Sequence, residues 1–140
     1  MKISIAVTGQ MKPLVFVMDA GSPDGKKFVG RLYDVEAGTS WKACSGPYGK
    51  GAAPKGVYYL ARPVAINPEA EENKPYKDKA GNAWFARLDP QFPTDRVGLG
   101  VHPDGNVPGT LGCIGIMEDD TKELFEMLYK MDHPVMVFVV

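Results

Sequence analysis

The sequence predicts a mainly β fold, a β-sandwich or barrel with one α-helix in the C-terminal half of the chain. Short runs rich in β-branched and aromatic residues alternate with stretches rich in glycine and proline, as strands and their connections do. Only one stretch has the periodicity of an amphipathic helix. With 140 residues, 44% of them apolar, the chain has the size and the core material of one ordinary domain. We therefore treat residues 1–140 as a single domain.

The N-terminal part of the chain is expected to form strands with short connections. Residues 2–7 and 13–19 are predicted to pair as an antiparallel hairpin. Residues 26–38 alternate less regularly between apolar and polar side chains. Residues 38–56 are rich in glycine, proline, serine and alanine, which favours a loop around at most one short strand. Residues 57–64 carry the aromatic and β-branched side chains of a further strand.

A polar segment then interrupts the strands. Residues 65–82 contain Pro68 and Pro75 among many charged side chains, which predicts a surface insertion. Residues 83–89 return to the pattern of a strand. Residues 133–140 are almost entirely apolar, which predicts a closing strand in the interior of the sheet.

The single predicted helix lies in residues 118–132. Asp120 is the expected N-cap, because Glu123 follows it by three residues as in a capping box. The apolar side chains that follow fall on one helical stripe, which consists of Leu124, Phe125, Met127, Leu128 and Met131.

Charge and composition exclude several classes of function. The formal net charge is -1, with 16 basic and 17 acidic residues scattered along the chain, so neither nucleic acid nor an anionic membrane is an expected partner. Gln10, Lys12 and Pro13 interrupt the apolar N-terminal stretch well short of a signal-peptide core or a membrane span. We therefore expect synthesis in the cytoplasm without a signal peptide, and two cysteines are too few for a disulfide framework.

The candidate chemistry lies in residues 98–116, which contain six glycines, two prolines, one histidine and one cysteine. If residues 97–102 are extended, alternate side chains share a face. One face then holds Val97, Leu99 and Val101, and the other holds Gly98, Gly100 and His102. Around the cysteine the same alternation predicts Ile114 and Ile116 on one face and Cys113 and Gly115 on the other. A glycine-lined groove of this kind suits an extended peptide backbone.

Cys113 and His102 are the candidate nucleophile and base. A cysteine is a strong nucleophile as thiolate, and an imidazole can take its proton or lower its pKa as an ion pair. Gly109, Thr110 and Gly112 are expected to leave backbone N–H groups free to face a developing oxyanion. The alternatives are a small buried cysteine and a structural histidine. The cysteines and histidines lack the spacing of a zinc site, so we expect no metal and no cofactor.

Residues 102–116 resemble the active-site segment of the L,D-transpeptidase catalytic domain family (YkuD-like). In that segment a histidine and a glycine-containing turn precede a Ser/Thr-x-Gly-Cys motif, which residues 110–113 match. Upstream residues are similar to the family's Ser-Gly and Pro-x-Gly-x-Tyr/Phe pattern, namely Ser45, Gly46, Pro54, Gly56 and Tyr58. A helix and an apolar strand end the family's domain, as they are predicted to do here. The resemblance implies the L,D-transpeptidase fold, a β-sandwich or barrel, over nearly the whole chain.

The resemblance also implies an activity, which is acyl transfer on peptidoglycan stem peptides. In this interpretation Cys113, deprotonated by His102, attacks the stem and forms a thioacyl enzyme. The acceptor then decides between cross-linking, D-amino acid exchange, and L,D-carboxypeptidase or endopeptidase activity. The residues expected to bind the substrate are Tyr58, Trp84, Arg96, Gly98 and Gly100, with Arg96 as the candidate reader of the stem's carboxylates.

Two positions depart from the family's pattern. Leu111 stands where most members have a second histidine, and Gly115 stands where they have an arginine. The short interval between base and nucleophile is similar to that of a compact branch, which includes type VI secretion effectors and phage-borne relatives. This similarity implies a secretion-system or immunity partner and action at the periplasm or cell wall through a non-Sec route. The departures also keep open a catalytically inactive peptidoglycan-binding or virion structural domain of the same fold.

Overall fold

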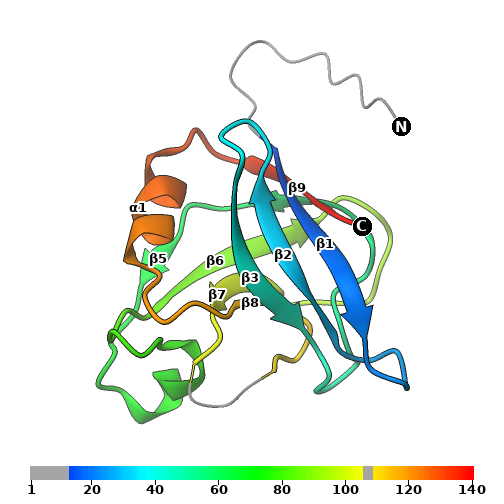
Figure 1. Ribbon diagram of the computed structural model, residues 1–140, viewed down its shortest axis with the longest axis horizontal. Helices are drawn as coiled ribbons and strands as arrows, with labels where there is room; N and C mark the ends of the chain where they lie inside the picture. The colour runs from blue at the N-terminus through cyan, green and yellow to red at the C-terminus, as the bar shows by residue number, and fades with distance from the viewer. Residues whose placement is uncertain (1–12, 106–108) are drawn as a thin grey trace.

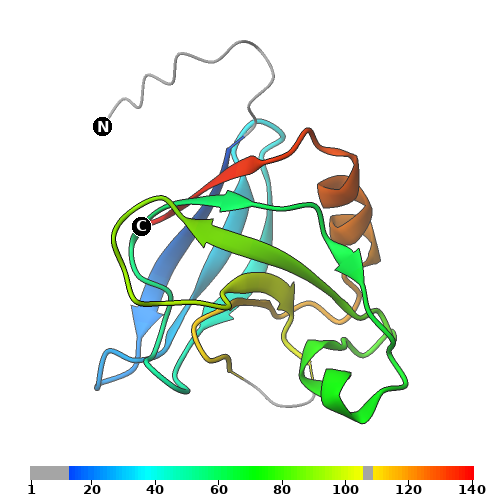
Figure 2. The same ribbon diagram turned by 180° about the vertical axis from the view of Figure 1, so that it is seen from behind.

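The computed structural model describes residues 13–105 and 109–140, and within them the chain forms a mainly β barrel with one α-helix (Figures 1 and 2). The strands are β1 (Leu14–Gly21), β2 (Phe28–Asp34), β3 (Thr39–Ser45), β4 (Gly56–Leu60), β5 (Val64–Ala65), β6 (Trp84–Pro90), β7 (Gly100–Pro103), β8 (Ile114–Ile116) and β9 (Val135–Val139). The helix α1 spans Lys122–Lys130, and a 3-10 helix η1 spans Glu71–Tyr76. The predicted fold class is confirmed.

The nine strands belong to one sheet that closes on itself. Their order is β4-β9-β1-β2-β3-β8-β7-β6-β5, and an additional pairing of β4 with β6 joins the two sides. Most neighbours are antiparallel, but β1 with β9 and β7 with β8 are parallel pairs. Because β5 pairs only with β6, it forms a short edge outside the closed barrel.

The core fills the barrel with the side chains that alternate inward along each strand. In β9, for example, Val135, Val137 and Val139 are buried while the residues between them are only partly buried. Two large aromatic side chains, Tyr58 and Trp84, are almost completely buried in the same core. Burial along these strands therefore follows the period of two that an extended backbone imposes.

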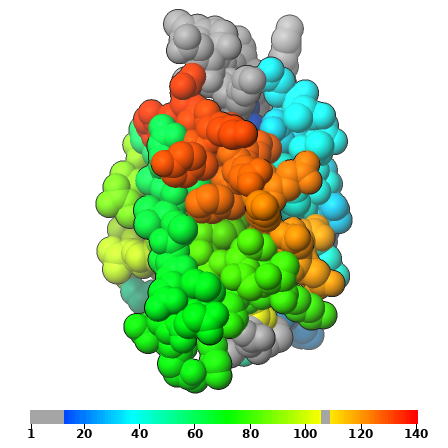
Figure 3. All heavy atoms as spheres, turned by 90° about the vertical axis from the view of Figure 1, so that its left-hand side faces the viewer, coloured from blue at the N-terminus to red at the C-terminus, as the bar shows by residue number. Residues whose placement is uncertain are grey.

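The helix and the polar insertion lie next to each other on one side of the barrel. Figure 3 shows α1 in orange above the green segment of residues 61–80. Leu124 and Leu128 of α1 are buried against the core, whereas η1 contributes no buried residue. The predicted surface insertion is therefore confirmed, although it contains one 3-10 helix.

Several sequence-based expectations need correction. The segment expected to be a loop around at most one short strand does contain one strand, β3, but this strand has seven residues and pairs with β2 along its whole length. The helix begins one residue later than predicted, with Thr121 as N-cap rather than Asp120. Val97 is 87% exposed because the extended geometry begins only at β7. The predicted strand at residues 2–7 lies outside the described residues.

A buried polar network explains the shift of the helix start. The Asp78 carboxylate accepts hydrogen bonds from the Thr121 N–H at 2.7 Å and from the Thr121 hydroxyl at 2.8 Å. The Thr121 hydroxyl also accepts a hydrogen bond from the Trp84 indole N–H at 2.8 Å. Asp78 further accepts hydrogen bonds from the N–H and the side-chain amide of Asn82. This network joins the insertion, β6 and the N-terminus of α1.

Replacing Asp78 with asparagine is expected to destabilise the fold by about 2 kcal/mol at pH 7, because hydrogen bonds to a buried carboxylate are lost. Burial by itself would raise the pKa of Asp78, but the hydrogen bonds from Asn82 and Thr121 outweigh it and lower that pKa from its ordinary value of 3.8. The stabilisation is therefore fully present above pH 3.8, the ordinary value, and is lost as the pH falls through the lower value of the folded protein. Urea unfolding of both proteins at pH 7 and at acid pH measures this difference.

The matched control for that experiment is Asp120→Asn. The Asp120 carboxylate accepts hydrogen bonds from Asn82 and from the Lys122 N–H, but the side chain is exposed. Its replacement should therefore cost clearly less than that of Asp78. Equal losses for the two variants would contradict a special role for the buried carboxylate.

Candidate active site

His102 projects from β7, a short strand between β6 and β8. Val101 points into the core and His102 to the opposite side, as the alternation predicted. The imidazole stacks on the Phe85 ring at 6.0 Å between centroids and meets the edge of the Tyr76 ring at 4.7 Å. A Cβ at Gly100 would overlap the Phe85 ring. Gly100 is therefore needed for the aromatic packing that holds His102.

Cys113 immediately precedes β8, the parallel neighbour of β7. In this pair Val101 lies opposite Ile114 and His102 opposite Gly115. Ile114 and Ile116 are fully buried in the core, so the alternation predicted for this strand is confirmed. The Cys113 Sγ lies 3.7 Å from the carbonyl oxygen of Gly98.

Cys113 and His102 line the same pocket. Its volume is about 240 Å³. The other residues that line it are Tyr48, Pro75, Tyr76, Gly98, Gly109, Thr110 and Leu111. The two predicted reactive side chains are thus brought together by the parallel pairing of two strands that follow each other in the chain.

The hydrogen bonding of His102 defines its reactive nitrogen. Nδ1 lies 2.6 Å from the carbonyl oxygen of Pro103. Because a carbonyl can only accept a hydrogen bond, Nδ1 carries the proton, and Nε2 is the basic nitrogen of the neutral ring. Burial lowers the pKa of His102, against smaller opposing effects of the Pro103 carbonyl and the Asp104 carboxylate. The imidazole is therefore neutral at pH 7 and able to accept a proton.

The Cys113 thiol is also neutral in the resting protein. Burial raises its pKa above the ordinary value of 9.0, while the Gly100 N–H and the Arg96 guanidinium act in the opposite direction. The alternative of a thiolate and imidazolium pair would require a depressed thiol pKa. The direction of both pKa shifts instead favours a neutral thiol beside a neutral base.

With this geometry in hand, comparison with known proteins identifies the fold family. The family model of the L,D-transpeptidase catalytic domain, YkuD, matches residues 24–137. The chain belongs to this family. L,D-transpeptidase 1 of Mycobacterium tuberculosis is a solved structure similar to it, with 16% sequence identity and a TM-score of 0.43. That alignment covers 91% of this chain and 62% of the other chain. A search of curated protein sequences finds no match.

Within this L,D-transpeptidase domain, Thr110 stabilises the turn before Cys113. Its hydroxyl donates to the Cys113 carbonyl at 2.6 Å and accepts from the N–H groups of Gly112 and Gly46. The Thr110 N–H donates to the Gly46 carbonyl at 2.7 Å. The N–H groups of Thr110 and Gly112 are therefore already hydrogen-bonded, and the expectation that they are free to face an oxyanion is wrong in this conformation.

The residues expected to bind substrate occupy different places. Gly98 lines the pocket, while Gly100 lies beneath Phe85. Tyr58 and Trp84 are core residues rather than groove walls, because both side chains are buried and bond to internal partners. The structure thus corrects the placement of these two aromatic residues, which the alternation of their strands directs inward.

Sequence reasoning missed the two tyrosines of the pocket. Tyr48 comes from the loop after β3 and Tyr76 from the end of η1. Neither residue belongs to a periodic stretch or a motif, so no signal in the sequence placed them beside Cys113. Both segments reach the site only because the barrel brings their loops to one end.

Gly115 and Asp104 explain one departure from the family's pattern. A Cβ at Gly115 would lie 2.8 Å from the Cβ of Asp104. The Asp104 carboxylate accepts hydrogen bonds from the Cys44 thiol at 3.1 Å and from the Gly109 N–H at 3.2 Å. Asp104 thus fills the space above Gly115, and it anchors the far end of the segment that joins β7 to β8.

Cys44 has the properties of a bystander. It is fully buried in β3, and burial, followed by the adjacent Asp104 carboxylate, raises its pKa to about 12. It does not line the pocket of Cys113. Cys44 is therefore not placed to act on a molecule bound in that pocket.

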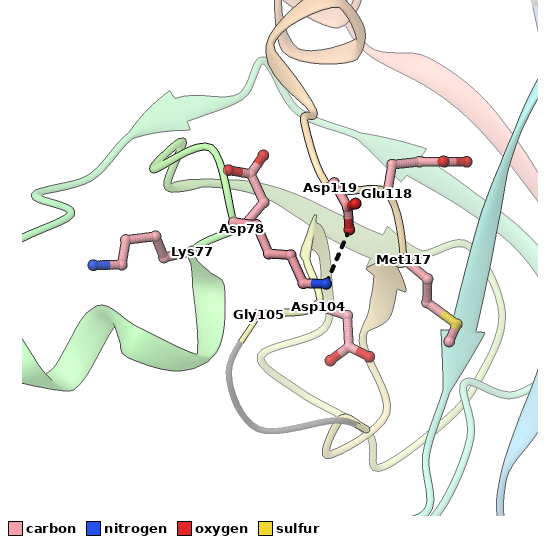
Figure 4. A pocket seen from close by; sticks show the side chains of 8 residues that line it. Lys77, Asp78, Asp104, Gly105, Met117, Glu118 and Asp119 are labelled. Atoms are coloured by element: carbon pink, nitrogen blue, oxygen red, sulfur yellow. Dashed lines mark ion pairs between the residues drawn. The ribbon is translucent and has the colours of Figure 1, made fainter.

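A second, larger hollow lies beside the site and is lined mainly by charged side chains (Figure 4). Its volume is about 480 Å³, and an ion pair of 3.6 Å between Lys79 and Asp119 spans part of it. Among the described residues, no group of three or more histidine, cysteine, aspartate or glutamate side chains could hold a metal ion. Over the same residues, no helix is long and apolar enough to cross a membrane.

Proposed function

We propose that this protein is a cysteine-dependent acyltransferase of the L,D-transpeptidase type that acts on peptidoglycan stem peptides. The observation that carries the proposal is the shared pocket of Cys113 and His102, with Nδ1 of His102 bound to the Pro103 carbonyl. This bond leaves Nε2 as the base of a neutral imidazole. The family assignment supports the substrate class.

Acylation begins with transfer of the thiol proton to Nε2 of His102. The Cys113 sulfur then forms a bond to the carbonyl carbon of the diaminopimelate residue in a tetrapeptide stem. As the intermediate collapses, the C–N bond to D-alanine breaks, and the imidazolium returns its proton to the leaving amine. The products are free D-alanine and a thioacyl enzyme with a neutral histidine.

Deacylation uses the same base, which now takes a proton from the acceptor and returns it to the sulfur. An acceptor amine or a water molecule gives a proton to Nε2 and attacks the thioester carbonyl. The C–S bond breaks, and the sulfur takes the proton back from the imidazolium. An amine of a second stem gives a cross-link, a D-amino acid gives exchange, and water gives carboxypeptidase activity.

Mass spectrometry of purified muropeptides incubated with the protein tests this function. We expect loss of D-alanine from tetrapeptide stems and an intact-protein mass increased by one acyl stem, with the adduct on the peptide that contains Cys113. Stems that remain unchanged, together with an unmodified protein, would contradict the proposal and favour the inactive binding domain.

Leu111 provides a separate test of whether the site is complete without the family's second histidine. Its side chain is 68% exposed and lines the pocket. Leucine cannot donate, accept or titrate, so Leu111→His should change the pH profile or the choice of acceptor but leave acylation within about threefold. The measurement is the rate of adduct formation against pH for both proteins. Acylation by Leu111→His alone, with none by the native chain, would identify the native chain as an inactive relative.

The expectations of action at the cell wall and of a secretion-system or immunity partner stay predictions. Action at the cell wall follows from the proposed substrate, because stem peptides occur in the wall. A secretion-system or immunity partner would in turn follow from action at the wall. Pull-down from a producing cell with Cys113→Ala as bait would test the partner.

A further inference from the structure

Arg96 lies in the loop between β6 and β7 and reaches into the site without lining the pocket. Its Nη1 donates to the Ala52 carbonyl at 3.1 Å, and its Nη2 donates to the Gly51 carbonyl at 2.8 Å. Nη2 also donates to the Leu111 carbonyl at 3.3 Å. One guanidinium therefore joins the loop after β3 to the segment that immediately precedes the nucleophile.

The contact with the nucleophile segment continues at Gly112. A Cβ at this residue would overlap the Arg96 guanidinium, and its φ of +126° is strained for any residue other than glycine. The glycine before Cys113 thus creates the space in which the guanidinium lies. Three carbonyl partners and this close packing fit the planar fork of arginine and not the single ammonium of lysine.

We propose that Arg96 is a positioning residue of the nucleophile, which holds the backbone at Leu111 and Gly112 so that Cys113 faces His102. This inference rests on the proposed acyl transfer. It assigns to Arg96 a role different from the carboxylate reading expected from the sequence, because three of the five guanidinium N–H donors already bind backbone carbonyl groups.

An exposed ion pair provides a matched control. Lys50 and Asp95 form a 2.6 Å bridge between the loop after β3 and the β6–β7 loop that carries Arg96, and this bridge does not include the Leu111 carbonyl that Arg96 binds. If Arg96 acted only by tying these loops together, Lys50→Ala would have the same effect as Arg96→Ala. If Arg96 positions the nucleophile, Lys50→Ala should stay within about threefold of the native rates, since exposed ion pairs contribute little.

The first measurement needs no substrate. The rate of Cys113 alkylation by iodoacetamide is followed against pH for the native protein, Arg96→Ala, Arg96→Lys and Lys50→Ala. We expect Arg96→Ala to alkylate more slowly at pH 7 and to have its midpoint at higher pH, because a cation beside the sulfur is lost. Arg96→Lys keeps the charge and should largely restore the midpoint.

The second measurement is the release of D-alanine from tetrapeptide stems with free or amidated diaminopimelate carboxylates. We expect Arg96→Ala to lower kcat by about tenfold or more with KM nearly unchanged, equally on both stems, because misplacing a reactive group affects the chemical step. Arg96→Lys should leave most of this loss in place, since it cannot bind all three carbonyls.

Each other outcome overturns the inference. A loss confined to KM on the free stem, absent on the amidated stem, would make Arg96 a carboxylate reader. Full recovery of kcat in Arg96→Lys would mean that Arg96 acts only through its positive charge. An equal loss of kcat in Lys50→Ala would mean that Arg96 acts only by connecting the two loops. If the native protein releases no D-alanine, the proposed function fails independently of Arg96, and an alkylation rate of Cys113 that is unchanged in Arg96→Ala would then overturn the role of Arg96 as well. Thermal unfolding identifies a variant that does not fold. If Arg96→Ala does not fold, the native protein is compared with Arg96→Lys instead.

Discussion

Replacing Cys113 with alanine is expected to abolish release of D-alanine from tetrapeptide stems, by at least about a thousandfold, while the protein stays folded. The side chain faces the pocket rather than the barrel core, and its sulfur has a weak contact with the Gly98 carbonyl. Replacing Cys113 with alanine therefore removes the nucleophile but few packing contacts. Mass spectrometry of the muropeptides measures turnover, and thermal unfolding measures the fold.

Cys44→Ser is the matched control, because Cys44 is the only other cysteine in the chain. Serine keeps a donor for the Asp104 carboxylate, so the hydrogen bond that Cys44 makes can persist. We expect turnover within about threefold of the native rate, and a single iodoacetamide adduct on the native folded protein. Turnover by Cys113→Ala at the native rate would remove Cys113 from the mechanism. Abolished turnover in a folded Cys44→Ser variant would mean that the site contains more reactive groups than proposed.

The second large effect is expected at His102. His102→Ala should reduce turnover by about a thousandfold or more and should also slow alkylation of Cys113 near neutral pH, because the neutral thiol loses its base. His133→Ala, which removes the only other histidine, should leave turnover within about threefold because His133 is absent from the residues that line the pocket. Loss of turnover in a folded His133→Ala variant, with His102→Ala active, would move the base to His133.

The pH dependence of kcat/KM gives an independent test of His102. Activity should fall as the pH decreases, because protonation of Nε2 removes the base. Burial lowers the pKa of His102 below its ordinary value of 6.5, so the acid limb should lie below pH 6.5. The limb reports the coupled thiol and imidazole pair rather than one residue. An acid limb clearly above pH 6.5 would contradict a buried neutral base.

Periodicity along the strands made much of the barrel predictable, together with the faces on which His102 and Cys113 lie. The alternation of small and apolar residues correctly assigned Leu99, Val101 and Ile114 to the core and left His102 and Cys113 on the other face. Side chains of a strand point to alternate faces for local steric reasons, which a single sequence contains. The helical stripe of α1 was predictable for the same reason, although its first residue was not.

Where local signals were weak, the prediction failed at identifiable residues. β3 lies in a stretch rich in glycine and serine, and it becomes a strand because β2 and β8 pair with its two edges. Thr121 replaces Asp120 as the N-cap because Asp78, more than forty residues earlier in the chain, binds its N–H and its hydroxyl. In both cases a partner from a distant segment decides the outcome.

The sequence by itself determined the face of the strands on which the candidate residues His102 and Cys113 lie. The tertiary structure alone decided that β7 and β8 are parallel neighbours, that Tyr48 and Tyr76 close the pocket, and that Arg96 binds carbonyls of two other segments. It also set the direction of the pKa shifts, because burial raises the pKa of Cys113 and lowers that of His102. The physical reason is range: alternation is set by neighbours along the chain, whereas burial, hydrogen-bond partners and electrostatics depend on segments that only folding brings together.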